Sequence, residues 1–419
     1  MARAAADDSL PWTSGGNAPL PVVFHIRHFG VGGIESALLG WLQGLDRRRF
    51  APSLSIFLPT REWFEVWRDR VPADVPVGLA VPPDAPVVAR HQARREGRLN
   101  GLGRIALDLS LQAAARRWLR PHLARWSQGH AVWIDFDHTL RKTVPALRHP
   151  VVAFRHFAFW DTANAKSRRV GRDLARYRRV LVLNDDMRRQ AEQLWGVERA
   201  GAPRCVVVPN LFDLTAMRDR ATAALPVSTM PQIQRPFAVC VARLDIGTKG
   251  LDTLIDAWQV LRASEPEAHL VIVGGGNDQT ALQERIDRHG LAHHITLVGM
   301  QPNPYPWIAQ ARFLVSASRS EGAPNVLVEA MALGTPIVAT DCPVGPADFL
   351  QQGACGALVP VDDVAALAGA MRTAWCEAGW RDTMSARGRV RAQDFSQERG
   401  NDRLAAVMAE VTAECQRSG

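Results

Sequence analysis

The second half of the chain alternates short apolar runs with longer segments in which apolar residues recur every three or four positions. Short β-branched runs predict strands, and the longer spacing predicts helices. The expected strands are 237–241, 269–273, 295–298, 313–316 and 336–339. The expected helices are 250–261, 278–289, 306–311 and 324–333, with more helix from 364 onward. Strands that alternate with helices form parallel sheets joined by right-handed crossovers.

The first half has the same alternation with more interruptions. A strand at 21–27 runs into the loop Gly30-Val-Gly-Gly33, and a helix and a strand at 53–58 follow. Segments rich in Arg, Pro and Trp fill 61–130. Apolar runs then return at 131–134, 151–154, 180–183 and 205–210. We therefore expect an α/β fold of two doubly wound, Rossmann-like domains that face a central cleft, with ligands beyond the carboxyl ends of the strands.

Breaks in these patterns divide the chain into five parts. We expect a flexible tail at 1–20, an N-terminal domain at 21–212, a linker at 213–235, a C-terminal domain at 236–392 and a final helix at 393–419. The length of 419 residues suits two or three domains.

Composition narrows the class of protein. Apolar residues make up 47% and charged residues 22%, which is typical of a soluble globular protein. No apolar run reaches the roughly 18 residues of a membrane span, and the N-terminus has no apolar segment typical of a secretory signal. Six scattered cysteines form no C-x-x-C pair, so we expect reduced thiols in a cytoplasmic protein.

Charge is unevenly distributed along the chain. Residues 1–225 contain 34 Lys and Arg against 21 Asp and Glu, whereas residues 226–419 contain 16 against 21. A basic surface attracts phosphates on nucleic acids, anionic lipids or nucleotides. The two halves are therefore expected to meet different partners.

Two glutamates eight positions apart are the strongest chemical signal. Glu321 falls in a strand-to-helix loop, and Glu329 falls just past the first turn of the helix. Gly322 permits close approach of a ligand to the backbone, and Pro324 suits a helix start. The amino end of a helix can hold a phosphate, and nearby carboxylates can accept hydrogen bonds from sugar hydroxyls. The structural alternative is a solvated loop residue and a dipole-stabilising helix residue.

Two cations bracket the loop that follows the strand at 237–241. Arg243 lies just after the strand, and Lys249 lies at the start of the next helix. A lysine at a helix start is disfavoured by the helix dipole, so an anion between the two cations would explain the pattern. Together they can clamp a diphosphate. The alternative is a pair of surface cations.

Glycines form two further loops. Gly32 and Gly33 follow the first strand and can bring backbone N–H groups to a phosphate or sugar, although a plain tight turn explains them equally well. The run Gly274-Gly-Gly276 suggests a dinucleotide site, but the next strand ends at Gly299 without the acidic residue that a ribose would need.

Polar residues also follow two strands of the first half. Asp135 and Asp137 form an Asp-x-Asp pair that could bind a divalent metal, a short and common pattern. His138 and His156 follow the strands at 131–134 and 151–154. A histidine in such a place can position a hydroxyl or carry a proton, and a merely buried histidine is an equal alternative for each.

From about Phe237 to Leu358 the chain resembles the retaining glycosyltransferases of family GT4, which have the GT-B fold and a glycogen-synthase-like C-terminal domain. The glutamate motif and its tail, from Gly334-Thr-Pro to Val-Gly-Pro346, carry the resemblance. It is patchy but ordered from Val22 to Asn210. Pro209-Asn-Leu-Phe-Asp213 resembles the family's domain connection, and Asp394-Phe-Ser396 resembles the start of the final helix that crosses back to the first domain.

The resemblance implies a role for each candidate residue. Arg243, Lys249, Gly32 and Gly33 would meet the donor diphosphate, and Glu329 would hold the ribose. Glu321 would act at the donor sugar, in a loop that contacts the sugar and phosphate and consists of Gly322, Ala323, Pro324 and Asn325. A catalytic histidine near the sugar is suggested at His138 or His156. The family implies no metal and no tightly bound cofactor, so the Asp-x-Asp metal hypothesis loses weight.

The activity implied is transfer of a hexosyl unit, with retained configuration, from a nucleotide-diphosphate sugar. A UDP-sugar is favoured over a GDP-sugar. The acceptor would be a saccharide or a lipid-linked molecule in bacterial surface polysaccharide or lipopolysaccharide synthesis. The departing diphosphate would help to deprotonate the acceptor hydroxyl. The basic half fits an anionic acceptor or an anionic membrane surface, either in the cytoplasm or on the inner face of the cytoplasmic membrane.

Two alternatives remain at this point. One is a sugar-nucleotide epimerase or hydrolase with the same fold. The other is a basic protein that binds nucleic acid or membrane without catalysis. The chain has no recognisable nucleic-acid module and no aromatic stacking signature, so no nucleic-acid partner is expected.

Overall fold

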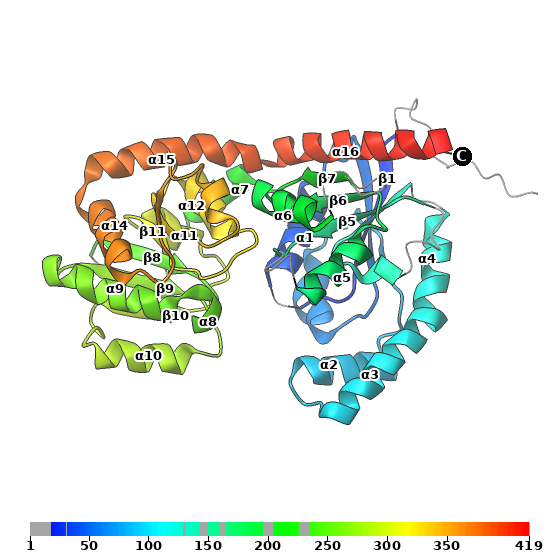
Figure 1. The fold of residues 1–419 in the computed structure, drawn as a ribbon, viewed down its shortest axis with the longest axis horizontal. Coiled ribbons are helices and arrows are strands. Elements are labelled where there is room, and N and C mark those ends of the chain that lie inside the picture. The colour runs from blue at the N-terminus through cyan, green and yellow to red at the C-terminus, as the bar shows by residue number, and fades with distance from the viewer. Residues whose placement is uncertain are drawn as a thin grey trace, which may run out of the picture. The chain divides into compact units, whose positions relative to one another are not determined.

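The computed structural model describes most of the chain as two α/β units (Figure 1). The described residues are 18–30, 32–128, 131–142, 149–158, 164–195, 204–225 and 235–418. The N-terminal unit comprises the chain up to Leu183, Arg188–Leu211 and the chain from Gly400. The C-terminal unit comprises Asn184–Met187 and Phe212–Arg399.

The described residues of the N-terminal unit form a seven-stranded sheet in the order β3-β2-β1-β4-β5-β6-β7. Its strands are β1 (Leu20–Ile26), β2 (Phe50–Ile56), β3 (Val77–Leu79), β4 (Val132–Asp135), β5 (Val151–Arg155), β6 (Arg179–Val182) and β7 (Arg204–Val207). Every neighbouring pair is parallel. Helices cover both faces of such a sheet, so its central strands are buried, including the polar residues His25, Ser53 and Ser55.

The helices of this unit join the strands in the expected alternation. They are α1 (Gly33–Gly44), α2 (Pro86–Arg95), α3 (Gly101–Ala114), α4 (Arg120–Ser127), α5 (Ala165–Leu174) and α6 (Asp185–Trp195), the last of which begins among residues grouped with the C-terminal unit. Short π and 3₁₀ turns lie at η1 (Trp63–Trp67), η2 (Arg68–Arg70), η3 (Ala115–Leu119) and η4 (Thr139–Lys142). The final helix α16 (Gln397–Ser418) belongs to this unit from Gly400.

The described residues of the C-terminal unit form a six-stranded sheet in the order β10-β9-β8-β11-β12-β13, again parallel throughout. Its strands are β8 (Phe237–Val241), β9 (His269–Val273), β10 (Ile295–Gly299), β11 (Leu314–Ser316), β12 (Ile337–Thr340) and β13 (Ala357–Val359). Its helices are α7 (Leu214–Ala221), α8 (Ile246–Lys249), α9 (Leu251–Ser264), α10 (Gln279–Arg288), α11 (Tyr305–Gln310), α12 (Asn325–Leu333), α13 (Pro346–Phe349), α14 (Val364–Cys376) and α15 (Ala378–Ala392).

Alternate residues of the C-terminal strands enter two apolar cores, one on each face of the sheet. In β8, Ala238 and Cys240 pack into a core with Trp258 of α9 and Trp375 of α14. Val239 packs into the other core, which is built largely from α7, α11 and α12. The sheet is therefore buried on both faces, and the polar candidate residues lie in loops at its carboxyl edge.

The structure adds elements that the apolar pattern did not indicate. Strands β3 and β13 are three residues long, and α8 is a single turn, so each is too short to show a period. Helix α7 lies within the segment expected to be a linker, and its Leu214 and Met217 enter the C-terminal core. Helix α12 begins at Asn325, one residue after the expected start.

Two chain segments that resembled family landmarks lie side by side in the C-terminal unit. Phe212 forms a parallel bridge with Ser396. The Phe212 N–H donates to the Phe395 carbonyl at 3.1 Å, and the Gln397 N–H donates to the Phe212 carbonyl at 3.2 Å. The segment before α7 and the start of α16 are thereby tied together. None of the described helices combines the length and apolar content that a membrane crossing requires.

Each sheet has a switch point, where neighbouring strands lead to connections on opposite faces. In the N-terminal sheet it lies between β1 and β4, and in the C-terminal sheet between β8 and β11. Ligands of doubly wound sheets bind at the carboxyl edge near such a point. The loops that follow β8 and β11 carry Arg243, Lys249 and Glu321, and those after β1 and β4 carry Gly32 and His138.

The N-terminal unit buries several histidines in uncharged form. Burial lowers the pKa of His25 and His28 to about 3 and that of His91 and His122 to about 4. Ser55 links two of them, lying 3.0 Å from His25 Nδ1 and 2.9 Å from His122 Nε2. The rings of His28 and His91 lie edge to face, 4.6 Å apart. Protonation of these histidines in the unfolded chain therefore opposes folding at acidic pH.

We expect the N-terminal unit to lose stability as the pH falls from 7.5 to 5.5. Unfolded histidine titrates near 6.5, so each histidine that stays neutral in the fold costs about 1 kcal/mol at pH 5.5. Asp135, whose burial raises its pKa to about 7, opposes this trend but is outnumbered. The check is the melting temperature as a function of pH for the wild type and for His91→Leu, which should show a shallower dependence.

The control is His293→Leu, because His293 is exposed in the C-terminal unit. Its pH dependence should match the wild type. A wild-type melting temperature that is flat across this range would contradict the assignment of neutral buried histidines.

Candidate functional site

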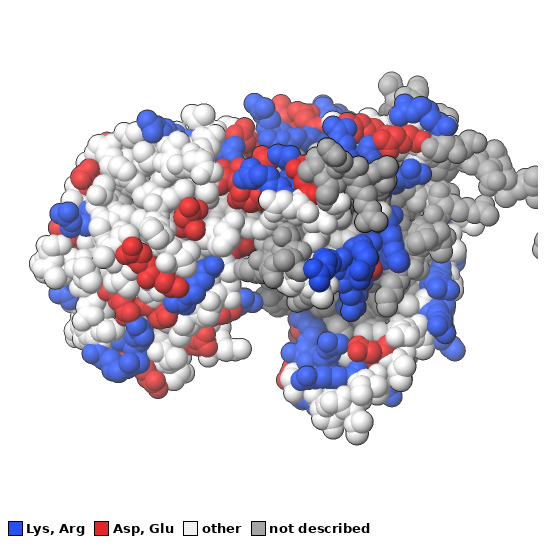
Figure 2. All heavy atoms as spheres, viewed as in Figure 1, with Lys and Arg blue, Asp and Glu red and all other residues white. Residues whose placement is uncertain are grey.

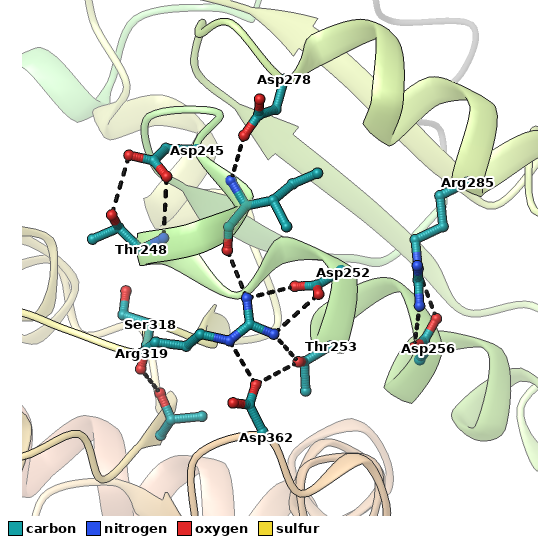
Figure 3. A network of polar contacts seen from close by, with 12 residues as sticks. Asp245, Thr248, Asp252, Thr253, Asp256, Asp278, Arg285, Ser318, Arg319 and Asp362 are labelled. Atoms are coloured by element: carbon teal, nitrogen blue, oxygen red, sulfur yellow. Dashed lines mark hydrogen bonds and ion pairs between the residues drawn. The ribbon is translucent and has the colours of Figure 1, made fainter.

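The loop after β8 is held in place by two carboxylates. Asp245 Oδ1 accepts a hydrogen bond from the Thr248 N–H at 3.1 Å, and Oδ2 accepts one from the Thr248 hydroxyl at 3.1 Å. Asp278 accepts from the Ile246 N–H at 2.7 Å. These bonds satisfy the free N–H groups at the start of α8 (Figure 3), and so they fix a single helical turn that would be unstable alone.

Gly250 allows the chain to turn from α8 directly into α9. Its φ of +58° lies in the left-handed region. An added Cβ would lie 2.1 Å from the Ala317 carbonyl oxygen, at the end of β11. The two loops on either side of the switch point therefore touch through bare backbone at this place.

Lys249 and Glu321 meet across the switch point. Lys249 Nζ lies 2.5 Å from Glu321 Oε1, and both side chains are largely buried, with exposed fractions of 20% and 12%. The Ser318 hydroxyl donates to the same carboxylate oxygen at 2.7 Å. Thr340, at the end of β12, anchors this loop by donating to the Ser318 carbonyl at 2.6 Å. Two residues 72 positions apart in the sequence thus form one charged pair at the sheet edge.

Arg319 fastens the Glu321 loop to α8 and α9 (Figure 3). Its guanidinium donates to the Ile246 carbonyl at 2.7 Å, and it forms ion pairs with Asp252 at 2.9 Å and with Asp362 at 2.8 Å. Thr253 completes the group by donating to Asp362 at 2.9 Å. The partners raise the pKa of Arg319 above its usual range, so the guanidinium stays charged. Its donors are committed to the protein, which makes Arg319 a positioning residue.

Arg243 occupies the other side of the same loop. It pairs with Asp245 at 3.0 Å, and its side chain is 66% exposed. Asp245 therefore contacts both Arg243 and the α8 turn that ends in Lys249. An exposed guanidinium with one ion-pair partner can exchange that partner for an anionic ligand at little cost.

Two of the three glycines after β9, Gly274 and Gly276, serve packing. A Cβ on Gly274 would lie 1.8 Å from the Ala242 carbonyl oxygen, and one on Gly276 would lie 2.3 Å from the Leu244 carbonyl oxygen. Gly274 has a φ of +150°. The glycines thus let the loop after β9 lie directly against the Arg243 loop, which explains them without a dinucleotide.

Glu329 lies on α12 of the same unit, eight positions after Glu321. It is partly buried, and burial raises its pKa to about 7, while Arg220 acts in the opposite direction. Arg220 also lies over the Tyr305 ring, 4.6 Å from its centre. Among the described residues Glu329 has no hydrogen-bond partner, so its oxygens are available to a ligand.

The segment Gly322 to Asn325 connects Glu321 to α12. Its Gly322 carbonyl accepts a hydrogen bond from the Asn184 side chain at 2.6 Å. Pro324 packs against Gly345, where φ is +104° and an added Cβ would lie 2.8 Å from Pro324 Cδ. Close packing on both sides defines the path of this segment.

In the N-terminal unit, the Asp-x-Asp pair shapes a turn. The fully buried Asp135 accepts hydrogen bonds from the Tyr177 hydroxyl at 2.6 Å and from the Leu140 N–H at 2.8 Å. Asp137 accepts from the Arg27 N–H at 3.0 Å and from the Thr139 hydroxyl at 2.5 Å. The carboxylates thus hold the backbone after β4, which accounts for both aspartates without a metal ion.

That turn presents His138 in an uncommon backbone conformation. Its φ of +60° lies in the left-handed region, which few residues other than glycine adopt. Burial lowers its pKa well below the usual value, while a hydrogen bond to the Phe154 carbonyl acts in the opposite direction. Nε2 is buried and has no partner among the described residues. A neutral imidazole held in this way can accept or donate one further hydrogen bond through Nε2.

His156 lies beside His138 and is packed between aromatic rings. Its ring stacks on Phe154 with centres 4.8 Å apart and lies 4.2 Å from the Phe136 ring. Burial lowers its pKa to about 3, and its Nε2 also has no partner in the described part of the unit. Both candidate histidines are therefore neutral.

Both histidines line a cavity of about 660 Å³ in the N-terminal unit. Three arginines share the wall: Arg141, which pairs with Asp173 at 3.2 Å, Arg155 and the exposed Arg169 of α5. Figure 2 shows Lys and Arg side chains gathered over α5. Burial lowers the pKa of Arg155 to about 10, which still leaves it charged at neutral pH. The cavity wall thus combines aromatic rings with cationic side chains.

The glycine loop after β1 borders the same cavity through its neighbour Ile34. Gly32 precedes the first residue of α1, and no side chain caps the helix start. Glu35 instead accepts a hydrogen bond from the Gly30 N–H at 2.8 Å. A Cβ on Gly33 would meet nothing within 4 Å, so this glycine faces open space.

The structure therefore groups the predicted residues by unit. It joins Lys249 to Glu321 directly, places Arg243 on the same loop, and brings His138 and His156 to one cavity. Arg319, Ser318 and Asp362 support the Lys249–Glu321 pair and were not singled out from the sequence. Arg319 lies inside the glutamate motif, but its partners are up to 73 positions away, so no local pattern indicates its role.

Comparisons with known proteins agree with this geometry. Residues 235–376 match the family model described as "Glycosyl transferases group 1". The D-inositol 3-phosphate glycosyltransferase of Jonesia denitrificans is 28% identical over 66% of this chain and 68% of its own. The lipopolysaccharide core biosynthesis glycosyltransferase LpsE of Rhizobium meliloti is 28% identical over 42% of this chain and 50% of its own.

A similar fold is known from a crystal structure. Alr3699/HepE of Anabaena, solved in complex with UDP and glucose, matches with a TM-score of 0.69 and 18% identity, over 93% of this chain and 100% of that one. This agreement confirms the expected α/β GT-B fold of two doubly wound units.

The curated matches are partial. The alignments span 50% and 68% of the length of these two relatives, and 36% of an uncharacterized glycosyltransferase of Methanocaldococcus jannaschii that is 30% identical. The family match coincides with β8 to α14, which contain Arg243, Lys249, Glu321 and Glu329. The segment that carries the candidate donor residues, 235–376, is thus similar to the group 1 glycosyl transferases.

Proposed function

We propose that the protein is a retaining hexosyltransferase that uses a nucleotide-diphosphate sugar, with UDP as the favoured nucleotide. The observation that carries this proposal is the Lys249–Glu321 pair at the β8/β11 switch point. A cation and a carboxylate side by side suit a ligand that has both phosphates and hydroxyls. The related glycosyltransferases, and the UDP bound to the structurally similar HepE, support the same activity.

The cations of the C-terminal unit would stabilise the leaving diphosphate. The Lys249 ammonium has three donors, of which Glu321 takes one among the described residues. Arg243 is exposed and can turn from Asp245 to a phosphate. Charge that develops on the diphosphate as the sugar leaves would be offset by both groups, a role worth several kcal/mol at a transition state.

The carboxylates would orient the sugar and the ribose. Glu321 is held by Ser318 and Lys249, so it can accept hydrogen bonds from donor-sugar hydroxyls without moving. Glu329 has free oxygens and would accept hydrogen bonds from the ribose. In the reaction, the acceptor hydroxyl oxygen bonds to the anomeric carbon while the bond to the diphosphate breaks. The hydroxyl proton passes to the departing phosphate oxygen.

The cavity of the N-terminal unit would receive the acceptor. Its aromatic rings suit a saccharide ring, and Arg141, Arg155 and Arg169 suit an anionic substituent. His138 and His156 would position a hydroxyl. The saccharide or lipid-linked acceptor of a surface polysaccharide or lipopolysaccharide fits this cavity, and the match to LpsE supports that setting.

The first test identifies the donor nucleotide and then substitutes the charged residues of the candidate site. Thermal shifts with UDP-, GDP-, ADP- and TDP-sugars identify the nucleotide, because a ligand that binds the folded state raises the melting temperature. With the best donor, Lys249→Met, Arg243→Met and Glu321→Gln should each lower kcat by about a hundredfold. Transfer to acceptor is measured by mass spectrometry of the product.

Arg288→Met provides the matched control, since Arg288 is exposed at the end of α10. It should transfer as the wild type does. Normal turnover by all three site variants would refute the assignment. Release of free or epimerised sugar without an acceptor would instead identify a hydrolase or an epimerase.

We expect the affinity for the donor to depend on the protonation of Glu329. Below its pKa of about 7 the carboxyl is protonated and loses acceptor capacity, and above it the carboxylate accepts hydrogen bonds from the ribose. We expect the Kd for UDP-glucose, measured by calorimetry, to fall by up to about tenfold from pH 6 to pH 8. UDP-glucose is chosen because its diphosphate diester does not titrate in this range. Glu329→Gln should show a flat profile, and a wild-type slope in that variant would contradict the role.

The two histidines can be separated by paired variants. His138→Asn keeps a residue that tolerates a positive φ, so it should lower kcat at least about tenfold while leaving the melting temperature nearly unchanged. His156→Asn removes a ring packed between Phe136 and Phe154, so it should lower the melting temperature by several degrees. If only His156→Asn loses activity, the histidine that positions the acceptor hydroxyl is His156 and not His138.

A further inference from the structure

Helix α3 carries an exposed apolar stripe. Leu102, Ile105 and Leu109 have exposed fractions of 79%, 61% and 62%. Their spacing of three and four residues places them on one side of the helix. Leu107 and Ala114, from the opposite side, are fully buried. The helix is therefore packed against its own unit on one side and presents a second apolar side to the surroundings.

This stripe is unusual among the exposed apolar residues of the chain. The other large exposed apolar side chains of the described residues are spread over different loops and helices, such as Val260 on α9 and Val390 on α15. Single exposed apolar residues are normal, whereas a contiguous row marks a contact surface.

Arginines surround the stripe. From Pro86 to Arg120 the chain has eight arginines and only two acidic residues, Glu96 and Asp108. Asp108 pairs with Arg94 at 3.4 Å, and Glu96 pairs with Arg98. Three further arginines, Arg116, Arg117 and Arg120, are exposed along η3 and the start of α4, which continue directly from α3. The surface around the stripe is therefore strongly cationic.

Figure 2 shows the same arrangement at the end of the unit where α2 and α3 lie. Uncharged atoms cover the tip, and blue groups with some red ones lie beside it. An apolar stripe edged with arginine is the pattern of a helix that lies in a membrane interface, with its apolar side among the acyl chains and its cations at anionic headgroups. The excess of one charge along the whole segment matches a surface of uniform negative charge, such as an anionic bilayer.

We propose that the α3 side of the N-terminal unit docks on an anionic lipid bilayer. Leu102, Ile105 and Leu109 enter the interface, and Arg104, Arg116 and Arg117 contact lipid phosphates. The docked state positions the unit that we assign to the acceptor at the surface where a lipid-linked acceptor is found. Docking itself requires no donor, acceptor or turnover, so it can fail while the transferase activity stands, and the reverse also holds.

The test is co-sedimentation of the full chain with large unilamellar vesicles. Vesicles of pure phosphatidylcholine are compared with vesicles that contain 30% phosphatidylglycerol on a molar basis. The wild type should bind the anionic vesicles, bind the neutral vesicles weakly, and dissociate at high salt. Leu102→Ser/Ile105→Ser/Leu109→Ser should lower the partition coefficient at least about tenfold, and Arg116→Glu/Arg117→Glu should remove the preference for anionic lipid.

The matched control is Val260→Ser/Val390→Ser, which makes equally exposed apolar residues polar in the C-terminal unit. It should bind as the wild type does. All these substitutions lie on exposed positions, and unchanged melting temperatures verify that each variant folds.

Three results would overturn the proposal. The first is a wild type that does not sediment with anionic vesicles, and the second is a triple serine variant that binds as the wild type does. The third is a concentration-dependent dimer of the wild type, seen by light scattering, that the serine substitutions abolish. That outcome would assign the stripe to a second copy of the chain.

Discussion

The adjacency of β8 and β11 is the constraint on which the candidate donor site depends. These strands are neighbours in the sheet although β9 and β10 lie between them in the sequence. Their carboxyl ends therefore bring the Lys249 turn and the Glu321 loop to one place. Arg319 then ties the two loops together through Asp252 and Asp362, so the position of the Lys249–Glu321 pair is set by a network that has no direct part in the chemistry.

In the N-terminal unit, a buried polar network likewise fixes a loop, with different residues. Asp135 ends β4 and is fully buried, so its hydrogen bonds to Tyr177 and to the Leu140 backbone are made in a medium where they are strong. They hold the turn that gives His138 its positive φ. In both units, buried polar residues organise a loop, and more exposed neighbours are left to meet a ligand.

The distribution of charge follows from this division of tasks. The C-terminal unit has fewer cations than the N-terminal unit, and three of them, Arg243, Lys249 and Arg319, lie in the loops at the switch point. The N-terminal unit carries arginines in the cavity beside His138 and again along α3 and η3. Its positive charge therefore serves two surfaces of different character. One is a concave wall that suits a small anionic group, and the other is an exposed apolar stripe edged with arginine.

Much of this protein can be inferred from its sequence. Runs such as Leu270–Val273 are apolar without interruption because both faces of a parallel sheet are covered, and the alternation with helices then implies a doubly wound fold. Motif spacing also predicts Arg243, Lys249, Glu321 and Glu329 as site residues, and the structure pairs two of them, Lys249 and Glu321. The short elements α8 and β13 show no period, and the partners of Arg319 and the stacking around His156 join residues that are distant in sequence. Contacts of that kind depend on strand order and side-chain packing, which local spacing does not encode.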